Sequence, residues 1–141
     1  MTFWMFFLAI ATYLTNTWFK RKEAKIQNVI RFSEFHRKIF SADSFPILNY
    51  EDLDNGTYVR DFSDKEMEKK FFNFLGDCEH ISFLKEASGI THEMNAYMMG
   101  WFCQKILPHL TEDERKTFFW SKAVKYIEET SEKSFNLSEK S

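Results

Sequence analysis

The chain has 141 residues, enough for one domain of ordinary size, and its four Gly and two Pro are too few for the tight turns of a β-sandwich or barrel. The formal net charge of −2 argues against a uniformly basic domain of the kind that binds nucleic acid. Aromatic residues make up 18% of the chain, and because each ring buries a large area, even a modest helical domain can hold a substantial core. We therefore expect an all-α protein with no nucleic-acid partner.

Charge is distributed unevenly along the chain. Residues 1–19 carry no charged side chain, and residues 20–40 carry seven Lys or Arg against two Glu. Residues 41–141 carry twelve basic and nineteen acidic side chains. A basic strip that directly follows an apolar start is typical of a segment that lies against a membrane surface.

The first nineteen residues have the pattern of a membrane anchor. Residues 3–11 are all apolar, and Trp4 and Trp18 stand near the two ends of the segment, where an aromatic belt would place them. Segment 3–19 is close to the lower limit of length for crossing a hydrocarbon layer of about 30 Å as a helix. The pattern predicts a single transmembrane helix in residues 1–19.

Three other interpretations of this segment stay open. A cleaved signal peptide is disfavoured because the basic residues follow the apolar run, although Ala9-Ile10-Ala11 mimics a cleavage site. A helix lying flat in the membrane interface would need a polar face, which residues 3–11 lack. An ordinary buried helix would make the basic flank and the Trp residues at both ends a coincidence.

Lys20, Arg21, Lys22 and Lys25 follow the apolar segment directly, and nothing basic precedes it except the amino terminus. Cytoplasmic flanks of membrane helices are enriched in Lys and Arg, so the charge pattern places the N-terminus outside and the C-terminal domain in the cytoplasm. These four side chains are the candidate contacts to anionic lipid headgroups, at about 1 kcal/mol for each cation near the surface.

Ala9, Thr12 and Asn16 lie three and four residues apart, on one stripe of the apolar segment. Small and hydroxylated residues let membrane helices approach closely, and an Asn amide can form a hydrogen bond across them. The stripe is therefore a candidate site of self-association in the bilayer. In the other interpretation, Asn16 lies in the headgroup zone and bonds water.

The first helix is expected to continue beyond the membrane. Residues 20–40 contain no Gly or Pro and repeat apolar residues at mostly three- and four-residue steps, so we predict a basic juxtamembrane helix over this range. Residues 41–62 contain Pro46, the Asn55-Gly56 pair and several acids, which is the composition of a connector. A short turn of helix or a brief strand at residues 58–62 fits within it.

Residues 63–130 have the pattern of a helical domain, and we expect a bundle of three to four helices. Ser63 and Glu66 match a capping box that starts one helix, which Gly89 ends. Thr91 is placed to cap the next helix, which is rich in aromatic residues and Met.

A last helix should begin with a second capping box, formed by Thr111 and Glu114. This helix would present Phe118 and Phe119 on its buried face. Residues 131–141 have the composition of a disordered polar tail.

Few residues are candidates for catalysis or metal binding. The possible ligands gather around the predicted turn at Gly89, and they are Asp77, Cys78, Glu79, His80, His92 and Glu93. Their spacing matches neither HExxH nor CxxC, and there is no Gly-rich phosphate loop, so we expect no catalytic, cofactor or metal site. Glu79 lies next to the core stripe and is expected to pair with a cation of another helix. Cys78 and Cys103 are expected to be buried, reduced thiols.

The stretch FFNFLGDCEHISFLKEASGITHEMNAYMMGWFCQKILPHL, residues 71–110, follows the apolar anchor and the basic helix. In this arrangement the chain resembles a widespread bacterial family of uncharacterised small membrane-anchored helical proteins, classified as a domain of unknown function. The positions that carry the resemblance are Asn73, Phe74, Leu75, Glu79, Ile81, Gly89, Ile90, Trp101 and Arg115. The resemblance implies this architecture in a bacterial membrane and adds no activity.

These features favour a non-enzymatic adaptor, anchored in a bacterial inner membrane, that binds a protein partner or another copy of itself. The alternative is a membrane-perturbing oligomeric effector of the toxin or phage-defence type, in which clustering of residues 3–19 permeabilises the bilayer. A hydrolase or nuclease that uses the residues around Asp77, His80 and His92 is the weakest of the three interpretations.

Overall fold

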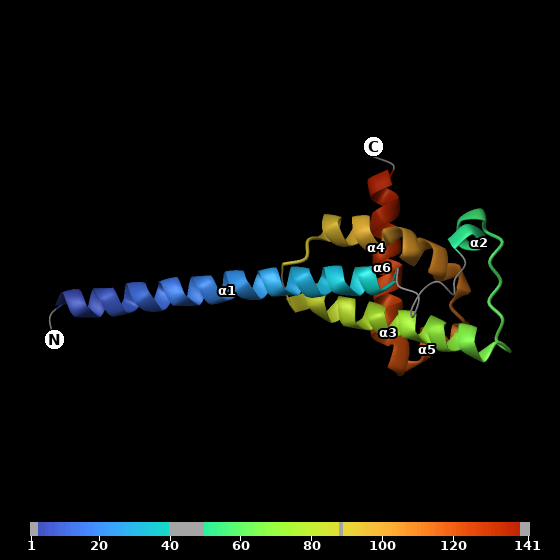
Figure 1. The fold of residues 1–141 in the computed structure, drawn as a ribbon, viewed down its shortest axis with the longest axis horizontal. Coiled ribbons are helices and arrows are strands. Elements are labelled where there is room, and N and C mark those ends of the chain that lie inside the picture. The colour runs from blue at the N-terminus through green and yellow to red at the C-terminus, as the bar shows by residue number, and fades with distance from the viewer. Residues whose placement is uncertain (1–2, 40–49, 88, 139–141) are drawn as a thin grey trace.

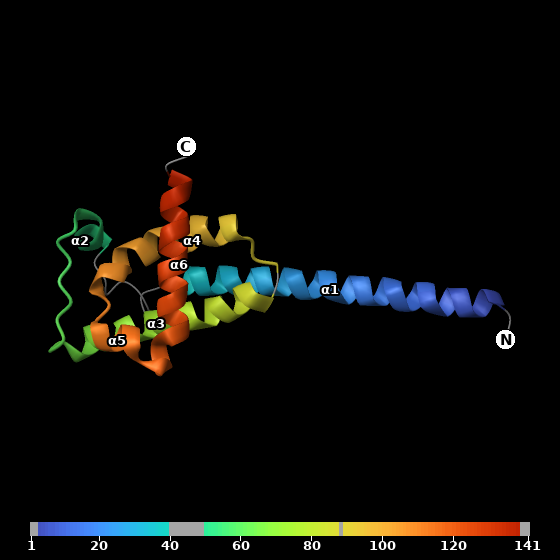
Figure 2. The ribbon, with the colours of Figure 1, turned by 180° about the vertical axis from the view of Figure 1, so that it is seen from behind.

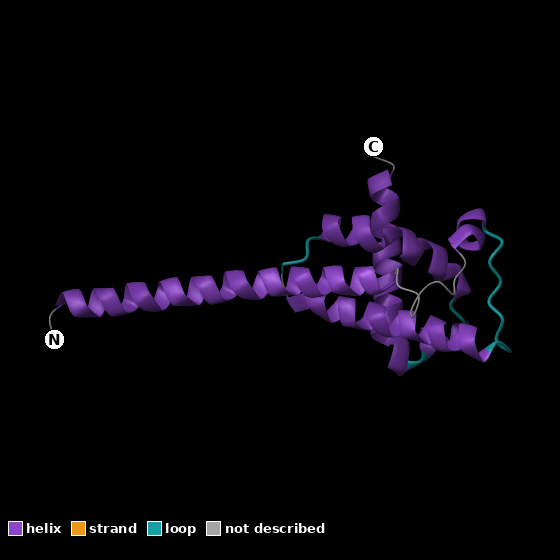
Figure 3. Cartoon of the chain, viewed as in Figure 1, coloured by secondary structure: helices purple, strands orange, loops and turns teal. Residues whose placement is uncertain are grey.

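The computed structural model describes residues 3–39, 50–87 and 89–138, and the regular secondary structure in these ranges is entirely helical (Figure 3). The predicted all-α class is therefore confirmed. The elements in chain order are α1 (Phe3–Ile39), α2 (Tyr50–Asn55), α3 (Lys65–Ala87), α4 (His92–Ile106), the 3₁₀ turn η1 (Leu107–His109), α5 (Glu112–Lys116), the 3₁₀ turn η2 (Phe118–Trp120) and α6 (Ser121–Ser138).

Helix α1 is a single unbroken helix of 37 residues. Its C-terminal part packs along α3 and buries Phe32 and Ile39 completely, whereas its N-terminal half extends away from the rest of the molecule (Figure 1). The predicted continuity between residues 3–19 and the basic helix over residues 20–40 is confirmed as far as Ile39. Phe40 lies outside the described residues.

The body of the molecule consists of α3, α4, α6 and the C-terminal part of α1. Helix α6 packs against both α4 and α3 and runs across them (Figure 2). It can approach α4 closely because Gly100 has no side chain, and a Cβ at this position would collide with the hydroxyl of Ser134. The large, fully buried apolar side chains are Phe32, Ile39, Phe71, Phe74, Leu75, Ile81, Met99, Ile106 and Ile127.

The capping box predicted for the start of α3 is wrong. The carboxylate of Asp64 caps this helix by accepting from the backbone N–H groups of Glu66 and Met67, at 3.0 and 3.1 Å. Ser63 lies one residue too early, and its hydroxyl donates to Asp61 at 2.6 Å. Ser and Asp are both good N-caps, so the position of the helix start decides between them.

The loop between α3 and α4 lies directly against α1, and its glycine is required for two reasons. Gly89 has a φ of +92°, and an added Cβ would lie 2.8 Å from the carbonyl oxygen of Lys25. Thr91 caps α4 as predicted, accepting from the N–H of Met94 at 3.1 Å. The loop therefore marks the position along α1 at which the body begins.

The last predicted helix is interrupted. The capping box of Thr111 and Glu114 is present, but the helix that it starts, α5, has only five residues and is followed by η2 before α6 begins. Thr117 interrupts the helix because its backbone is extended, with a ψ of 128°. Phe118 and Phe119 are consequently 92% and 67% exposed, and the prediction that they lie on a buried face is wrong.

The predicted disordered tail over residues 131–141 is helical as far as residue 138, where α6 ends. Distant parts of the body provide partners for this stretch. The ammonium of Lys133 lies 3.2 Å from His92, and Ser134 packs against α4. Local composition does not reveal such contacts, and for this reason the sequence predicted a disordered tail where the structure has a helix. Residues 139–141 lie outside the described part of the chain.

Only part of the predicted connector over residues 41–62 can be compared, because residues 40–49 lie outside the described ranges. Residues 50–55 form the short helix α2. The segment from residue 56 to α3 is irregular, and residues 58–62 form no strand. This segment leads back to the body and carries Arg60 into it.

Replacing Gly89 with Ala should destabilise the body by about 1–3 kcal/mol, because the positive φ and the backbone of α1 both oppose a Cβ. Gly76→Ala is the matched control. Gly76 lies inside α3 with nothing within 4 Å of an added Cβ, so this change should stabilise the protein by up to about 1 kcal/mol. Urea unfolding of the full-length protein in mild detergent measures both variants. Equal stabilities would contradict the close packing of the loop on α1.

Candidate functional site

The N-terminal half of α1 is the most exposed part of the described molecule. Every residue from Phe3 to Gln27 is exposed except Thr17, which is partly covered. Large apolar side chains are among them, with Phe3 75% and Trp4 78% exposed. Because consecutive residues of a helix point in different directions, this apolar run covers all sides of α1. No helix in the described ranges combines the length and the average hydropathy that mark a membrane-spanning helix.

Two polar side chains in this segment are satisfied inside the helix. The Thr15 hydroxyl donates to the carbonyl of Ala11 at 2.7 Å, and the Thr17 hydroxyl donates to the carbonyl of Tyr13 at 2.8 Å. A bond of this kind to the preceding turn removes the need for an outside partner. These threonines therefore add little to the cost of placing α1 in an apolar environment.

The stripe predicted for self-association, Ala9, Thr12 and Asn16, is exposed along its whole length. It lies on the half of α1 that projects from the body (Figure 1). Residues at this spacing share one side of a helix, so the stripe is available to a second copy. The structure holds one copy of the chain, and pairing through this stripe stays a prediction.

Lys20, Arg21, Lys22 and Lys25, the predicted contacts to lipid headgroups, are all exposed, and we call them the basic collar. The ammonium of Lys22 lies 5.2 Å from the centre of the Trp18 ring, a cation–π contact between the collar and the apolar segment. At Lys25 the collar meets the α3–α4 loop. The collar therefore occupies the stretch between the projecting segment and the body.

The residues considered as metal ligands do not converge. His80 faces α1, where it stacks on a phenylalanine ring with 5.4 Å between centroids. His92 faces α6, and its Nδ1 lies 3.2 Å from Nζ of Lys133. In the part of the chain that the structure describes, no three His, Cys, Asp or Glu side chains are placed to share a metal ion.

A carboxylate of α3 does pair with a cation of another helix, but it is Asp77 and not Glu79. Asp77 is 3% exposed, and its Oδ1 lies 3.1 Å from Nζ of Lys38 on α1. Glu79 remains partly exposed. The pair ties α1 to α3, which is a structural role.

Cys78 and Cys103 are fully buried free thiols, as predicted. Burial raises the pKa of both thiols well above the ordinary value. The thiolate is the form that attacks substrates and binds metals, so a thiol held protonated is inert. Neither cysteine has the properties of a catalytic nucleophile.

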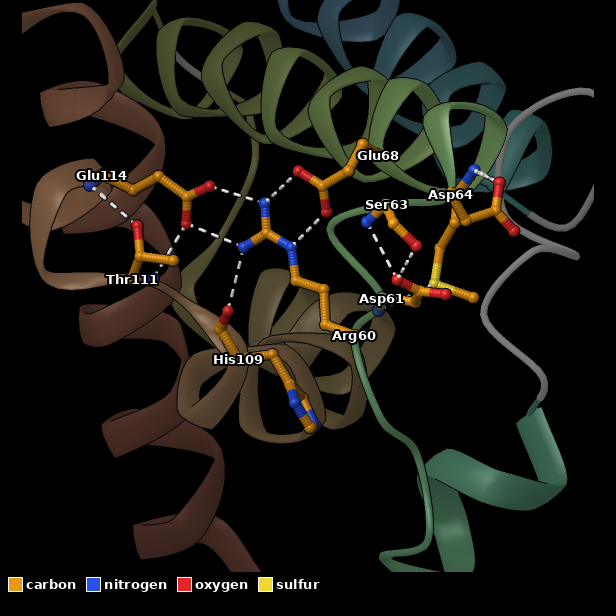
Figure 4. Close-up of polar contacts among 9 residues, drawn as sticks. Arg60, Asp61, Ser63, Asp64, Glu68, His109, Thr111 and Glu114 are labelled. Atoms are coloured by element: carbon orange, nitrogen blue, oxygen red, sulfur yellow. Dashed lines mark hydrogen bonds and ion pairs between the residues drawn. The ribbon is translucent and has the colours of Figure 1, made fainter.

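A buried polar cluster that the sequence did not indicate centres on Arg60, whose side chain is 3% exposed between α3 and α5 (Figure 4). Its guanidinium donates two bonds to Glu68, at 2.7 and 3.0 Å, and two to Glu114, at 2.6 and 2.9 Å. A fifth bond of 3.0 Å goes to the carbonyl of His109. All five N–H donors are used, so none remains for a ligand. We call Arg60, Glu68 and Glu114 the arginine clamp.

Aromatic rings and a helix cap support the arginine clamp. The guanidinium carbon of Arg60 lies 3.6 Å from the centre of the Phe71 ring and 4.8 Å from that of Phe62. Burial by itself would raise the pKa of Glu114, but hydrogen bonds from Arg60 and Thr111 outweigh it and leave this pKa below its ordinary value. The clamp thus keeps its charges fixed out of water and joins three separate segments.

The sequence identified Glu114 only as a member of the capping box. In the structure its Oε2 accepts from the N–H of Thr111 at 2.9 Å and also from Arg60. Arg60 itself carries no local signal, since its partners lie 8 and 54 positions away in the chain. A lone Arg in a connector is usually a solvated surface residue.

No family model, curated protein or solved structure matches this chain. The resemblance to the bacterial membrane-anchored family therefore stays a prediction. Several positions that carry it serve the core, since Phe74, Leu75, Ile81 and Ile90 are buried. Arg115 joins α5 to η1 by donating to a carbonyl at 2.8 Å. Such roles suit any helical domain and indicate no activity.

Replacing Glu114 with Gln should destabilise the protein by about 1.5–3 kcal/mol at neutral pH, because charged hydrogen bonds of the arginine clamp are lost. The pKa of Glu114 is lowered in the folded state. The stabilisation of the folded state by Glu114 is therefore complete above the unfolded pKa of about 4.3 and is lost as the pH falls through the folded pKa. The difference in stability between wild type and Glu114→Gln should shrink on acidification. Thermal unfolding of both proteins across this pH range measures it.

Glu112→Gln is the matched control for this change. Glu112 lies on the same helix, but its side chain is 77% exposed in an ion pair with Lys116. Its loss should cost less than about 1 kcal/mol. A penalty for Glu114→Gln that is equal to that of the control, or that does not vary with pH, would contradict the role given to the clamp.

Proposed function

We propose that the protein is a non-enzymatic interaction protein, anchored in a bacterial inner membrane by residues 1–19, with its body in the cytoplasm. One observation carries the proposal. The N-terminal half of α1 projects from the body (Figure 1). It exposes large apolar side chains on every side. Soluble monomers rarely expose a contiguous apolar surface of this kind, and a helix that is apolar all round is typical of a lipid environment.

The energetics of transfer support the anchor. Eleven large apolar side chains between residues 3 and 19 are at least 40% exposed. At about 1.5–3 kcal/mol for each side chain removed from water, their transfer is worth on the order of 20 kcal/mol. The segment is about 25 Å long as a helix, against a hydrocarbon layer of about 30 Å. Local thinning of the bilayer accommodates a shortfall of this size.

The polar groups of α1 are placed where a membrane tolerates them. Thr15 and Thr17 form hydrogen bonds within the helix, so Asn16 is the costlier side chain, and it lies three residues from the end of the apolar segment. The basic collar follows at the level of the headgroups. Anionic lipids attract such cations, and the positive-inside rule directs this flank to the cytoplasm.

The body offers a surface suited to a protein partner. Phe118 and Phe119 are 92% and 67% exposed. The Trp120 ring contacts Phe119 edge-on, with 4.7 Å between centroids, and stacks on Phe72 at 5.6 Å, so these three rings form one aromatic surface that Phe118 adjoins in the chain. Exposed aromatic clusters are typical of protein-binding sites. The proposal therefore assigns anchoring to α1 and partner binding to this aromatic surface.

Replacing Phe6, Leu8 and Ile10 together with Lys should release the protein from membranes, because each charge at the centre of a span costs about 2.5–3.5 kcal/mol to insert. The matched control places three lysines on exposed apolar positions of the body, which are Val59, Tyr97 and Phe135. After alkaline extraction, wild type and control should stay in the membrane pellet while the triple variant is lost. A triple variant that stays in the pellet would count against the anchor.

The second candidate is a membrane-perturbing oligomeric effector of the toxin or phage-defence type. It is favoured by the exposed stripe of Ala9, Thr12 and Asn16, which combines small residues with an amide that can form hydrogen bonds between helices. In this function the helices cluster and permeabilise the bilayer, and the body senses the trigger.

Purification of the tagged full-length protein in mild detergent, followed by mass determination, separates the two functions. The interaction protein should carry a stoichiometric partner or a second copy that is lost when Phe118 and Phe119 are replaced by Ser, with no effect of Asn16→Leu. The effector should form a larger homo-oligomer that Asn16→Leu dissociates, because the interhelical amide bond is removed. A monomer without a partner in every variant would exclude both functions.

A further inference from the structure

A pocket of about 300 Å³ opens between the C-terminal turns of α3, the start of α4 and α6. Three lysines line it, Lys85 from α3 and Lys122 and Lys125 from α6, together with the carboxylates of Glu86 and Glu129. Its volume is at the lower end of the range for small-ligand sites. We call it the lysine pocket.

The two carboxylates do not balance the cations of the lysine pocket. Lys122 pairs with Glu86 at 2.9 Å, and Lys125 lies 3.9 Å from Glu129. Lys85 forms no hydrogen bond or ion pair with any residue that the structure describes. Partial burial, reinforced by a neighbouring lysine, lowers the pKa of Lys85, as expected for a cation without a close counter-charge.

A fourth lysine stands beside the pocket. Nζ of Lys133 lies 3.2 Å from Nδ1 of His92, which is a lining residue. An ammonium group can only donate, so Nδ1 is the acceptor in this contact. The lining thus holds three ammonium groups against two carboxylates, an excess of one positive charge, and Lys133 adds a second cation beside it.

The lysine pocket lies at the end of the body from which α1 projects. The C-terminal end of α3 and the start of α4 lie beside the point where α1 leaves the body (Figure 1, Figure 2). The lining residue Ile90 follows Gly89, which packs on Lys25 of α1.

The position of Lys25 sets the height of the pocket above the membrane. Lys25 lies about 9 Å beyond Phe19 along the helix axis, at 1.5 Å per residue. The polar zone on each side of a bilayer is about 5–7 Å thick. With residues 1–19 inserted, the pocket therefore opens next to the headgroups.

We propose that the lysine pocket binds a phosphate monoester dianion. Such a group brings nearly two negative charges and three acceptor oxygens at neutral pH, which matches the unpaired ammonium of Lys85 together with the neighbouring cation of Lys133. A carboxylate or a phosphodiester brings only one charge. The phosphate comes either from a lipid headgroup, a source that rests on the proposed membrane anchoring, or from a soluble compound.

Acylation of Lys85 tests the proposal, because a bound phosphate shields this amine. The full-length protein in phosphatidylcholine nanodiscs is treated with an amine-acylating reagent, and mass spectrometry follows each lysine. The probes are glycerol 3-phosphate in solution and phosphatidic acid added to the nanodisc. Lys69, exposed on the same helix, is the internal reference. We expect acylation of Lys85 to slow about tenfold at ten times the Kd, with Lys69 unchanged.

The two probes separate the sources of the phosphate. Protection by phosphatidic acid alone assigns the pocket to a lipid headgroup, and protection by glycerol 3-phosphate, with or without phosphatidic acid, assigns it to soluble monoesters. Protection should disappear in Lys122→Met and persist in Lys65→Met, which changes an exposed lysine of α3 and leaves the reference Lys69 in place. Unchanged reactivity with both probes would overturn the proposal. Equal protection by phosphatidylglycerol, a diester, would also overturn it.

Failure of the pocket and failure of the anchor give different results. If the protein leaves the membrane on alkaline extraction but glycerol 3-phosphate protects Lys85 in detergent, the proposed phosphate site stands and the proposed anchoring fails. If the protein stays in the membrane but neither probe protects Lys85, the proposed anchoring stands and the proposed phosphate site is overturned.

Discussion

Continuity of the backbone hydrogen bonds in α1 is the constraint on which the rest of the structure depends. The helix has no Gly or Pro between Phe3 and Ile39, so its projecting half and the half that packs on α3 are parts of one rod. Gly89 fixes the height at which the body is attached, because a residue with a Cβ would meet the backbone of Lys25. Whatever surrounds residues 3–19 therefore also sets the orientation of α3, α4 and α6.

The arginine clamp performs the corresponding task at the other end of α3. Helix α5 has one buried residue, Glu114, so apolar packing contributes little to its position. The bonds between Glu114 and Arg60 hold it instead, together with the segment that precedes α3. A buried cation is costly unless every donor is paired, and here all five are. The clamp thus specifies the position of α5 relative to α3, which apolar packing does not determine.

Local signals in the sequence were enough to predict the continuous helix α1, the Thr91 cap and the second capping box, because each depends on residues within about one turn. They failed at the start of α3, where Ser63 and Asp64 are both good N-caps. The sequence favoured Ser63, whereas Asp64 caps the helix in the structure. The arginine clamp and the lysine pocket could not be predicted. Arg60 meets Glu114 across 54 positions, and the pocket joins three helices. Apolar periodicity assigns a side chain to a face, but it does not say which distant residue will lie opposite.

The burial of both cysteines has a consequence for the surface of the molecule. Cys78 and Cys103 are the two cysteines of the sequence, both lie in described helices, and both are 0% exposed. The folded chain therefore has no thiol that reacts quickly with a maleimide or a methanethiosulfonate reagent. A cysteine introduced on the projecting half of α1 or on the body becomes the single labelled position. A spin label there reports its own immersion depth while the native thiols continue to fill the core.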